Sequence, residues 1–445
     1  MIVYDAQRQP LTLGDPVGRG GEATVYKVPQ RPASLVKLYH GAPREGYDLK
    51  LAWMQAHPPD EPSPVLNHAS IAWPKALLYD DRGALVGYEM VHVHNAVPLL
   101  MVFNPRSRAK VLPAFNRKYL HRTARNLAAA LGALHASNYI VGDINESNIM
   151  VTPSALVTMI DADSFQVQRR IGAKPVLHPC PVGKPEYTPP ELQGKTFAEV
   201  PRQPEHDRFG LAVLIFQLLM DGNHPFRAQW LAGGDPPPVE DRIRDGHWPY
   251  ARRPGLPIAP PRHAPALDTL HPDLVALVRQ CFVDGHARPA ARPTPEAWER
   301  AISGAEKALT QCKHGHYHGR HLRQCPDCEA RENAARDLAA PQAAQGKPGS
   351  RPSTLPAQTP LPPASTSAPG LTPRLAALLK QITAPATASV PAVMVACPQC
   401  GTPNPGAEIY CQICATALAG KRRCAHCGRG IPAKAKFCPR CGLRQ

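Results

Sequence analysis

The chain has 445 residues, enough for two to four folded units, and its formal net charge of +16 permits acidic partners or nucleic acid without requiring either. The longest apolar run, Phe209–Met220, is too short to cross a bilayer, and the first residues lack the features of a secretory signal, so we expect a cytoplasmic protein that does not enter membranes.

A glycine-rich segment from Gly18 to Val28 leads into strand-like residues rather than into a helix. A dinucleotide-binding fingerprint would enter a helix, so this context favours a β-hairpin whose backbone covers the phosphates of a nucleotide. We expect Gly18, Gly20 and Ala23 in the phosphate-binding turn and Val25 against the base, although Ala23 stands where a third glycine is usual. A plain β-turn is the alternative.

The next strand-like run is centred on Lys37, whose amine can reach the α- and β-phosphates of a nucleotide from that position. A solvated lysine on an exposed strand face is the alternative. A helix should follow and supply a carboxylate that holds Lys37; the candidates are Glu45 and Asp48, and we favour Glu45. Further on, a hinge around Glu89 and Val91 is expected to hydrogen-bond the adenine.

Two acidic motifs give the strongest signal. Asp143 and Asn148 lie five residues apart, and Asp161 follows an apolar strand eighteen residues after Asp143. Phosphoryl transfer needs a carboxylate that accepts or orients the hydroxyl proton, and an Asn and an Asp that hold Mg²⁺ against the phosphates. We therefore predict Asp143 as the catalytic carboxylate, with Asn148 and Asp161 as magnesium ligands and ATP as the nucleotide. Asp163 is either a second magnesium-associated carboxylate or a residue at a strand end, and we favour the second interpretation.

These motifs, in this order over roughly residues 12–303, resemble the eukaryotic-type protein kinase superfamily, with V-G-D in place of H-R-D and D-A-D in place of D-F-G. Further segments similar to kinase motifs are Gly183–Glu191, Asp207–Phe209, Gly222–Phe226 and Arg292–Thr294. The resemblance implies a bilobal α+β fold and a Ser/Thr protein kinase that transfers the γ-phosphate of ATP to protein hydroxyls. It also implies that Arg292 pairs with Glu191.

The variant signatures G-D-x-N-x-x-N and D-x-D-S-F resemble a bacterial subgroup of these kinases whose members often carry zinc-binding tails. Some members are encoded beside a phosphatase and a von Willebrand A-type protein. The resemblance therefore implies these two as partners, besides protein substrates.

Departures from the family pattern lead to two hypotheses. Gly142 replaces the arginine that would bind a phosphorylated residue, and no Ser, Thr or Tyr lies between Phe165 and Val182. We expect a kinase that does not need phosphorylation of this segment. Asn145 stands where a phosphate-contacting lysine is usual, so we predict that Lys184 supplies that cation; a solvated loop lysine is the alternative.

All 13 cysteines except Cys180 and Cys281 lie beyond residue 311, nearly all in C-x-x-C pairs. In a cytoplasmic chain this spacing is typical of zinc binding, with redox dithiols and iron–sulfur ligation as alternatives. We expect a Cys₃His site of Cys312, Cys325, Cys328 and His316, for which His314 and His318 are rival ligands. Two structural Cys₄ ribbons are expected from Cys397, Cys400, Cys411 and Cys414, and from Cys424, Cys427, Cys438 and Cys441.

Residues before the ribbons are rich in Pro, Ala, Ser and Thr and cannot bury a core. The predicted domains are a kinase domain (1–305), a Cys₃His zinc-binding segment (306–332), a disordered Pro/Ala-rich linker (333–392) and a double zinc ribbon that docks partners (393–445). The alternatives are a pseudokinase scaffold in which the ribbons do the work, and a small-molecule phosphotransferase resembling aminoglycoside kinases. The last ribbon is basic enough for nucleic acid, but its one aromatic residue, Phe437, gives little support for base stacking.

Overall fold

The computed structural model describes most of the first 339 residues and four short strands beyond them. The described residues are 1–172, 174–233, 236–251, 255–262, 264–339 (backbone only from 333), 394–396, 403–405, 421–423 and 430–432. The chain divides into two compact units, Met1–Arg374 and Leu375–Gln445.

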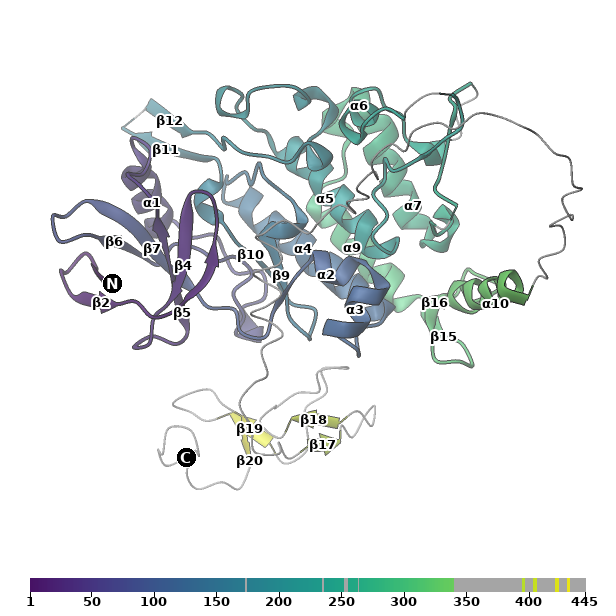
Figure 1. Cartoon of the computed structure of the whole chain (residues 1–445), viewed down its shortest axis with the longest axis horizontal. Helices are drawn as coiled ribbons and strands as arrows, with labels where there is room; N and C mark the ends of the chain where they lie inside the picture. Colours follow the sequence, from purple (N-terminus) through teal and green to yellow (C-terminus); the bar gives the residue numbers. More distant parts are fainter. Residues whose placement is uncertain are drawn as a thin grey trace, which may run out of the picture. The chain divides into compact units, whose positions relative to one another are not determined.

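The N-terminal part of the first unit is an antiparallel sheet of seven strands in the order β2-β1-β6-β7-β5-β4-β3 (Figure 1). Its strands are β1 (Ile2–Tyr4), β2 (Pro10–Thr12), β3 (Pro16–Arg19), β4 (Ala23–Lys27), β5 (Ser34–Tyr39), β6 (Ala76–Tyr79) and β7 (Leu85–Val91). Val36 and Leu38 of β5 join an apolar cluster with Val3 and Leu78. Because side chains alternate along a strand, Lys37 lies on the opposite face of the sheet.

The rest of the first unit is mainly helical. Helix α1 (Tyr47–Ala56) lies beside the sheet. The helices that follow it are α2 (Leu100–Phe103), α3 (Pro105–Val111), α4 (Arg117–Ala136), α5 (Pro204–Leu219), α6 (Val239–Arg244), α7 (Pro272–Arg279), α8 (Gly285–Ala287) and α9 (Pro295–Lys307). The apolar run forms α5, where every residue from Phe209 to Leu219 is buried, and α4 packs against α5 and α9. No helix within the described residues has both the length and the hydropathy that a membrane crossing demands.

Short strands connect the two parts. Strand β8 (Val97–Pro98) pairs with β9 (Ile149–Val151), which pairs with β10 (Val157–Met159). After β10 the chain forms the hairpin of β11 (Val167–Ile171) and β12 (Lys174–His178), and β13 (Gln229–Trp230) pairs with β14 (Ile258–Ala259). The sheet followed by a helical part confirms the expected α+β fold.

The predicted Cys₃His segment packs on the helical part of the same unit. It contains β15 (Leu309–Gln311), β16 (Tyr317–Gly319) and α10 (Pro326–Ala339). Arg117, the first residue of α4, pairs with Asp327 at 2.9 Å, and the amine of Lys118 lies 5.2 Å from the ring centroid of Tyr317. These contacts join the segment to helix α4.

The second unit is described only as two antiparallel hairpins. Strand β17 (Met394–Ala396) pairs with β18 (Pro403–Pro405), and β19 (Lys421–Arg423) pairs with β20 (Gly430–Pro432). The eight ribbon cysteines and the predicted linker from residue 340 onward lie outside the described residues.

Candidate functional site

The predicted phosphate-binding turn is the β3–β4 hairpin. The amide of Gly20 donates to the carbonyl of Ala23 at 2.8 Å and closes the turn. Gly18 pairs with Val25, and Val25 pairs with Lys37 on β5, so all three residues share the face of the sheet opposite its apolar cluster. A Cβ atom at Gly18 would meet no atom within 4 Å. The structure therefore leaves open space at Gly18 on the face of the sheet that carries Lys37.

Lys37 lies between two carboxylates that follow β10. Its Nζ atom is 2.6 Å from Asp161 Oδ1 and 2.5 Å from Asp163 Oδ1. Burial by itself lowers the pKa of Lys37, but the charges of Asp163 and Asp161 outweigh this effect and hold the pKa above its ordinary value. Lys37 is therefore a permanent cation at this site.

Asp161 is the more accessible of the two carboxylates, since its side chain is 35% exposed whereas that of Asp163 is 3% exposed. Its backbone has a φ of 69°, a left-handed conformation that residues other than glycine adopt rarely and often at functional sites. The hydroxyl of Ser164 donates to the Asp161 carbonyl at 2.8 Å and helps to hold that conformation. The carboxylate is thus fixed in place and still open to a cation.

The carboxylate expected from the first helix is not beside Lys37. Glu45 is exposed and precedes α1, and Asp48 is also exposed. The residues that α1 buries are Lys50, Leu51 and Met54, so this helix presents a cation toward the site. The sequence prediction for Glu45 is corrected accordingly: Asp163, which we expected only to end a strand, is the second carboxylate on Lys37.

Asp143 and Asn148 meet in the loop before β9. Asn148 Nδ2 donates to Asp143 Oδ2 at 2.9 Å, and Asn145 Nδ2 donates to Oδ1 at 2.9 Å. Because its amide nitrogen is used in this way, Asn148 keeps its side-chain oxygen for another partner. Burial raises the pKa of Asp143 to about 6. The hydrogen bonds from Asn145 and Asn148 lower this pKa, and the nearby charge of Asp161 raises it by a smaller amount. The structure thus brings together the three residues predicted for phosphoryl transfer.

Gly142 in this loop has a positive φ of 71°, a backbone conformation that favours glycine. An added Cβ would lie 2.7 Å from the Cβ of Cys180, so a side chain at this position would collide with the segment after β12. The buried carboxylate of Asp207, in α5, accepts from the amides of Val141 and Gly142 at 2.8 Å each. The backbone before Asp143 is therefore fixed by α5 rather than by an arginine of the loop.

Lys184 lies beside the same loop. Its Nζ atom is 2.9 Å from Glu146 Oε1 and 2.9 Å from Ser147 Oγ, and 39% of its side chain is exposed. The structure places Lys184 close to the residues around Asp143.

The predicted hinge residues lie at the end of β7. Glu89 is inside the sheet: its carbonyl accepts from the amide of Lys75 at 2.8 Å, and its buried carboxylate pairs with Arg31. The carbonyl and the carboxylate of Glu89 are therefore both engaged within the sheet, and its contact with adenine stays a prediction. Val91 ends the strand, and the connection to β8 begins after it.

Arg292 and Glu191 form the pair that the family resemblance implied. Two guanidinium nitrogens of Arg292 bind the two carboxylate oxygens of Glu191 at 2.6 and 2.7 Å, and the arginine side chain is fully buried. The bidentate pair confirms that expectation and ties the segment after Lys184 to the helical part.

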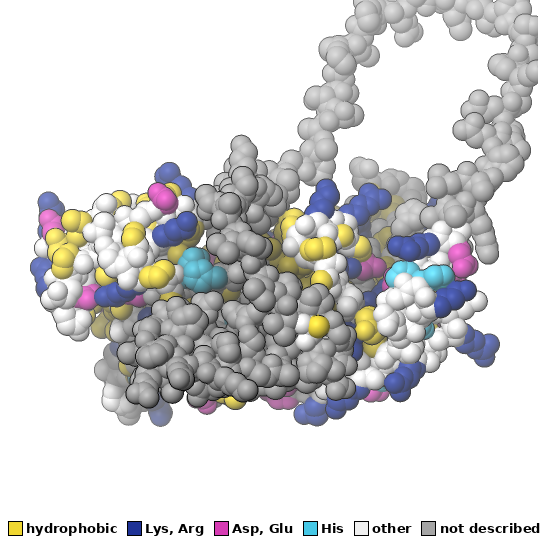
Figure 2. Space-filling model, turned by 90° about the horizontal axis from the view of Figure 1, so that it is seen from below, with side chains coloured by type: hydrophobic (Ala, Val, Ile, Leu, Met, Phe, Trp, Pro, Cys, Tyr) yellow, Lys and Arg dark blue, Asp and Glu magenta, His cyan; other side chains and the backbone are white. Residues whose placement is uncertain are grey.

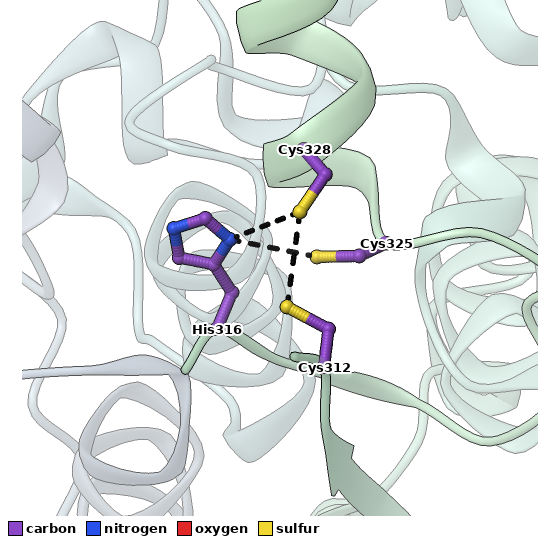
Figure 3. Close-up of side chains that lie close together, drawn as sticks. All are labelled: Cys312, His316, Cys325 and Cys328. Atoms are coloured by element: carbon purple, nitrogen blue, oxygen red, sulfur yellow. Dashed lines mark hydrogen bonds between the residues drawn. The ribbon is translucent and has the colours of Figure 1, made fainter. Parts of the chain in front are cut away.

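The Cys₃His cluster is the second candidate site (Figure 3). The ligand atoms of Cys312, His316, Cys325 and Cys328 all lie within 4.8 Å of one another. Sγ of Cys312 is 3.7 Å from Sγ of Cys328, and His316 Nδ1 is 3.4 Å from the latter and 3.8 Å from Cys325 Sγ. Zinc–sulfur bonds of roughly 2.3 Å in a tetrahedron separate two sulfurs by about 3.7 Å. The residues therefore fit a structural zinc ion.

His316 is the better of the rival histidine ligands. His314 Nδ1 also approaches Cys328 Sγ, at 3.2 Å, but His314 is exposed and is not among the four atoms that surround one point. His318 pairs with Thr310 in the β15–β16 hairpin.

Replacing Cys328 by serine should remove one zinc equivalent per chain, because a structural site needs its four ligands to close the tetrahedron. Metal analysis of the purified full chain by mass spectrometry measures this directly. Replacing His314 by alanine is the matched control and should leave the zinc content unchanged. Loss of zinc in the His314 variant together with retention in His316→Ala would contradict the ligand assignment.

The sequence did not predict that a cluster of hydroxyls and amines surrounds Asp163. Its members are Lys37, itself predicted only for phosphate binding, and Tyr39, Tyr47, Lys50 and Tyr88. Their hydroxyls and amines come from β5, α1 and β7, and no motif links them. A signal was nevertheless present, since an acid two residues beyond Asp161 stands where the family pattern has a glycine.

Comparison with known proteins finds one matching family model and several similar proteins. Residues 397–442 match the family model of the double zinc ribbon. The chain is 35% identical over 333 residues to "Protein kinase YegI" of Escherichia coli strain K12 and, equally, of E. coli O157:H7; each alignment covers 73% of this chain and 50% of the relative. Over 50 residues it is 39% identical to "Protein FraH" of Nostoc sp. PCC 7120, covering 11% of this chain and 17% of that protein. The chain thus spans about half the length of the curated kinases that it matches.

Proposed function

Because this chain is homologous to the protein kinases named YegI over most of its length, we propose that it is an ATP-dependent Ser/Thr protein kinase with a zinc-bound docking tail. The observation that carries the proposal is the convergence of Lys37, Asp161, Asp143 and Asn148 at one place. Each supplies a group that phosphoryl transfer from ATP requires. A scaffold without catalysis has no chemical need for the set.

Asp143 accepts or orients the proton of the substrate hydroxyl. Its two oxygens receive the amides of Asn145 and Asn148, which fix the carboxylate and leave its remaining lone pairs for the hydroxyl. Asn148 and Asp161 would hold Mg²⁺, which would neutralise charge on the phosphates. Lys37 binds the α- and β-phosphates from the sheet, and Lys184 supplies a second cation near the hydroxyl.

The double zinc ribbon would dock a protein partner, such as a substrate or the von Willebrand A-type protein and phosphatase that the family resemblance implies. A protein partner is favoured over nucleic acid because the last ribbon interleaves only one aromatic residue, Phe437, among its basic ones. Figure 2 adds that, on the face it shows, the lysine and arginine side chains of the described residues are spread among acidic and uncharged ones rather than gathered into one patch. Phosphate backbones are usually gripped by a continuous basic surface.

The test is phosphoryl transfer from γ-labelled ATP with Mg²⁺. The full chain is offered a general protein acceptor in one arm and an aminoglycoside in another. Label in Ser or Thr of the protein supports the proposal. Label only in the aminoglycoside identifies a small-molecule phosphotransferase, and nucleotide binding without transfer identifies a pseudokinase.

The kinase rate should fall as the pH drops through about 6. The pKa of Asp143 is raised by burial to about 6, and only its deprotonated form can take a proton from the substrate. Below that pH the carboxyl group is protonated, so kcat decreases toward zero; above it kcat reaches a plateau. A pH profile of kcat at saturating ATP measures the midpoint, and a flat profile from roughly pH 5 to pH 8, about one unit below to two units above that midpoint, would contradict this role.

Dephosphorylated enzyme should be as active as the enzyme isolated from cells. The segment from Asp163 to Pro190, here termed the activation segment, is held without a phosphate. Gln166 and Arg202 exchange two hydrogen bonds of 2.9 and 2.6 Å, and Arg202 Nη2 donates to the carbonyl of Val182 at 3.2 Å. Kinase assays before and after phosphatase treatment test this expectation, and a large gain in activity from phosphorylation within the activation segment would contradict it.

A further inference from the structure

Asp163 has an unusual environment for a carboxylate. Its side chain is 3% exposed, and both of its oxygens accept hydrogen bonds. Oδ1 receives Lys37 Nζ at 2.5 Å and the Tyr88 hydroxyl at 2.8 Å, and Oδ2 receives the Tyr39 hydroxyl at 3.0 Å and the Tyr47 hydroxyl at 3.3 Å. A buried charge is tolerated only when it is paired and hydrogen-bonded, and this one is.

The donors come from elements that surround Asp163 on several sides. Tyr39 is on β5, Tyr88 is on β7 and Tyr47 opens α1. Burial, and then the negative charge of Asp163, raise the pKa values of these tyrosines, so their hydroxyls remain protonated donors. The arrangement keeps the carboxylate in one orientation, with one oxygen directed at Lys37.

Helix α1 contributes a cation instead of an acid. Lys50 is buried, and its Nζ atom donates to the backbone carbonyl of Asp163 at 2.7 Å. In protein kinases a carboxylate on this helix pairs with the sheet lysine, and that pair must be formed for activity. Here the acid is Asp163, which stands where the family pattern has a glycine, and α1 contributes Lys50 instead of a carboxylate.

We propose that Asp163 is the positioning residue that aims Lys37 at the phosphates of ATP, in the place of a carboxylate on α1. The inference rests on the proposed kinase function and adds a specific partner for its lysine. It follows that one short turn, Asp161 to Asp163, both contributes a magnesium ligand and orients the lysine. Lys50 and Tyr47 of α1 then support that turn through its backbone and side chain.

A double-mutant cycle on kcat/KM for ATP tests the proposal. Asp163→Asn should lower kcat/KM by about 100-fold, the size of effect seen when one preorganised polar group is removed from an active site. In the background of Lys37→Met, the same substitution should cost less than about threefold, because a residue that acts through Lys37 has nothing left to position. If the loss of kcat/KM in the double variant equals the product of the losses in the two single variants, Asp163 acts independently of Lys37 and the proposal is overturned.

The controls separate this proposal from folding and from the proposed function. Asp81→Asn changes an exposed aspartate in the β6–β7 turn and should leave kcat/KM unchanged. If Asp163→Asn does not fold, as judged by thermal unfolding, the cycle is repeated with Lys50→Met present throughout, which removes one buried cation along with the buried anion. A wild-type chain that neither transfers phosphate nor binds nucleotide would refute the kinase function itself. An active wild type with kcat/KM unaffected by Asp163→Asn would refute only the role of Asp163.

Discussion

Replacing Asp143 by asparagine should reduce kcat by about 10²–10⁴-fold while KM for ATP changes little. The carboxylate is expected to touch the substrate hydroxyl rather than the nucleotide, so its loss affects the transition state and not ATP binding. Asparagine is nearly isosteric but cannot accept a proton. Its own amide would also face the amides of Asn145 and Asn148, which now donate to the two Asp143 oxygens.

The same substitution should not weaken the fold. Burial raises the pKa of Asp143, which means that the charged form is less favourable in the folded chain than in the unfolded one. Stability supplied by this residue is therefore greatest at acidic pH and decreases as the pH rises from its unfolded value toward about 6. At neutral pH asparagine removes that unfavourable contribution, which offsets the loss of one hydrogen bond from Asn145 or Asn148, so the free energy of unfolding should stay close to that of wild type.

Activity and stability of the Asp143→Asn variant are thus expected to move independently. Steady-state kinetics and urea unfolding at pH 7.5, roughly 1.5 units above the raised pKa of about 6, measure the two quantities on the same preparation. Asp81→Asn again serves as the exposed control with unchanged kinetics. A variant that loses activity only in proportion to lost folded protein would show that Asp143 is structural.

The sequence was sufficient to predict which residues the fold brings together at the proposed active site, because each of them is positioned by its local context. Lys37 follows a glycine-rich hairpin at the centre of a strand, and Asp161 follows an apolar strand that carries it to the end of β10. Such residues are positioned by the element that they belong to. Ligand spacing fixed the Cys₃His site in the same way, since two cysteines in C-x-x-C reach one ion whatever the rest of the fold does.

The partner of Lys37 was not predictable, because it depends on which side of α1 faces the sheet. Local sequence allowed Glu45 or Asp48 to face inward, yet the rotation of the helix is set by the burial of Leu51 and Met54, and this leaves Lys50 inside. Packing of α1 against elements distant in sequence therefore determines which of its side chains faces Lys37. Local sequence likewise did not indicate that Glu89 lies inside the sheet, where β7 pairs with both β5 and β6.

The attachment of the Cys₃His segment to α4 was also beyond local reasoning. The ion pair of Arg117 with Asp327 joins residues 210 positions apart, and the local sequence around neither residue predicts it. Burial of Arg117 lowers its pKa, but its hydrogen bond to Asp327 outweighs this and raises the pKa above its ordinary value. The metal segment is therefore held to the helical part by charge as well as by chain continuity.

Replacing Arg292 by methionine should lower the free energy of unfolding by about 3–5 kcal/mol, the usual cost of breaking a buried ion pair by removing one partner. The arginine is fully buried and donates to Glu191 through two nitrogens, and also to the carbonyls of Gly285 and Glu205 at 2.9 and 3.0 Å. Methionine fills much of the same volume but leaves these acceptors without a donor.

Lysine at position 292 should rescue little of that stability, because a single ammonium group cannot reproduce the planar fork that binds both carboxylate oxygens and the two carbonyls. Urea unfolding of Arg292→Met, Arg292→Lys and the exposed control Arg300→Met measures the difference; the control should stay within about 0.5 kcal/mol of wild type. The pair also anchors the end of the activation segment to α5, so kcat should fall in Arg292→Met even where the protein remains folded. Wild-type stability in Arg292→Lys would mean that a point charge suffices, and the bidentate geometry would then have no energetic role.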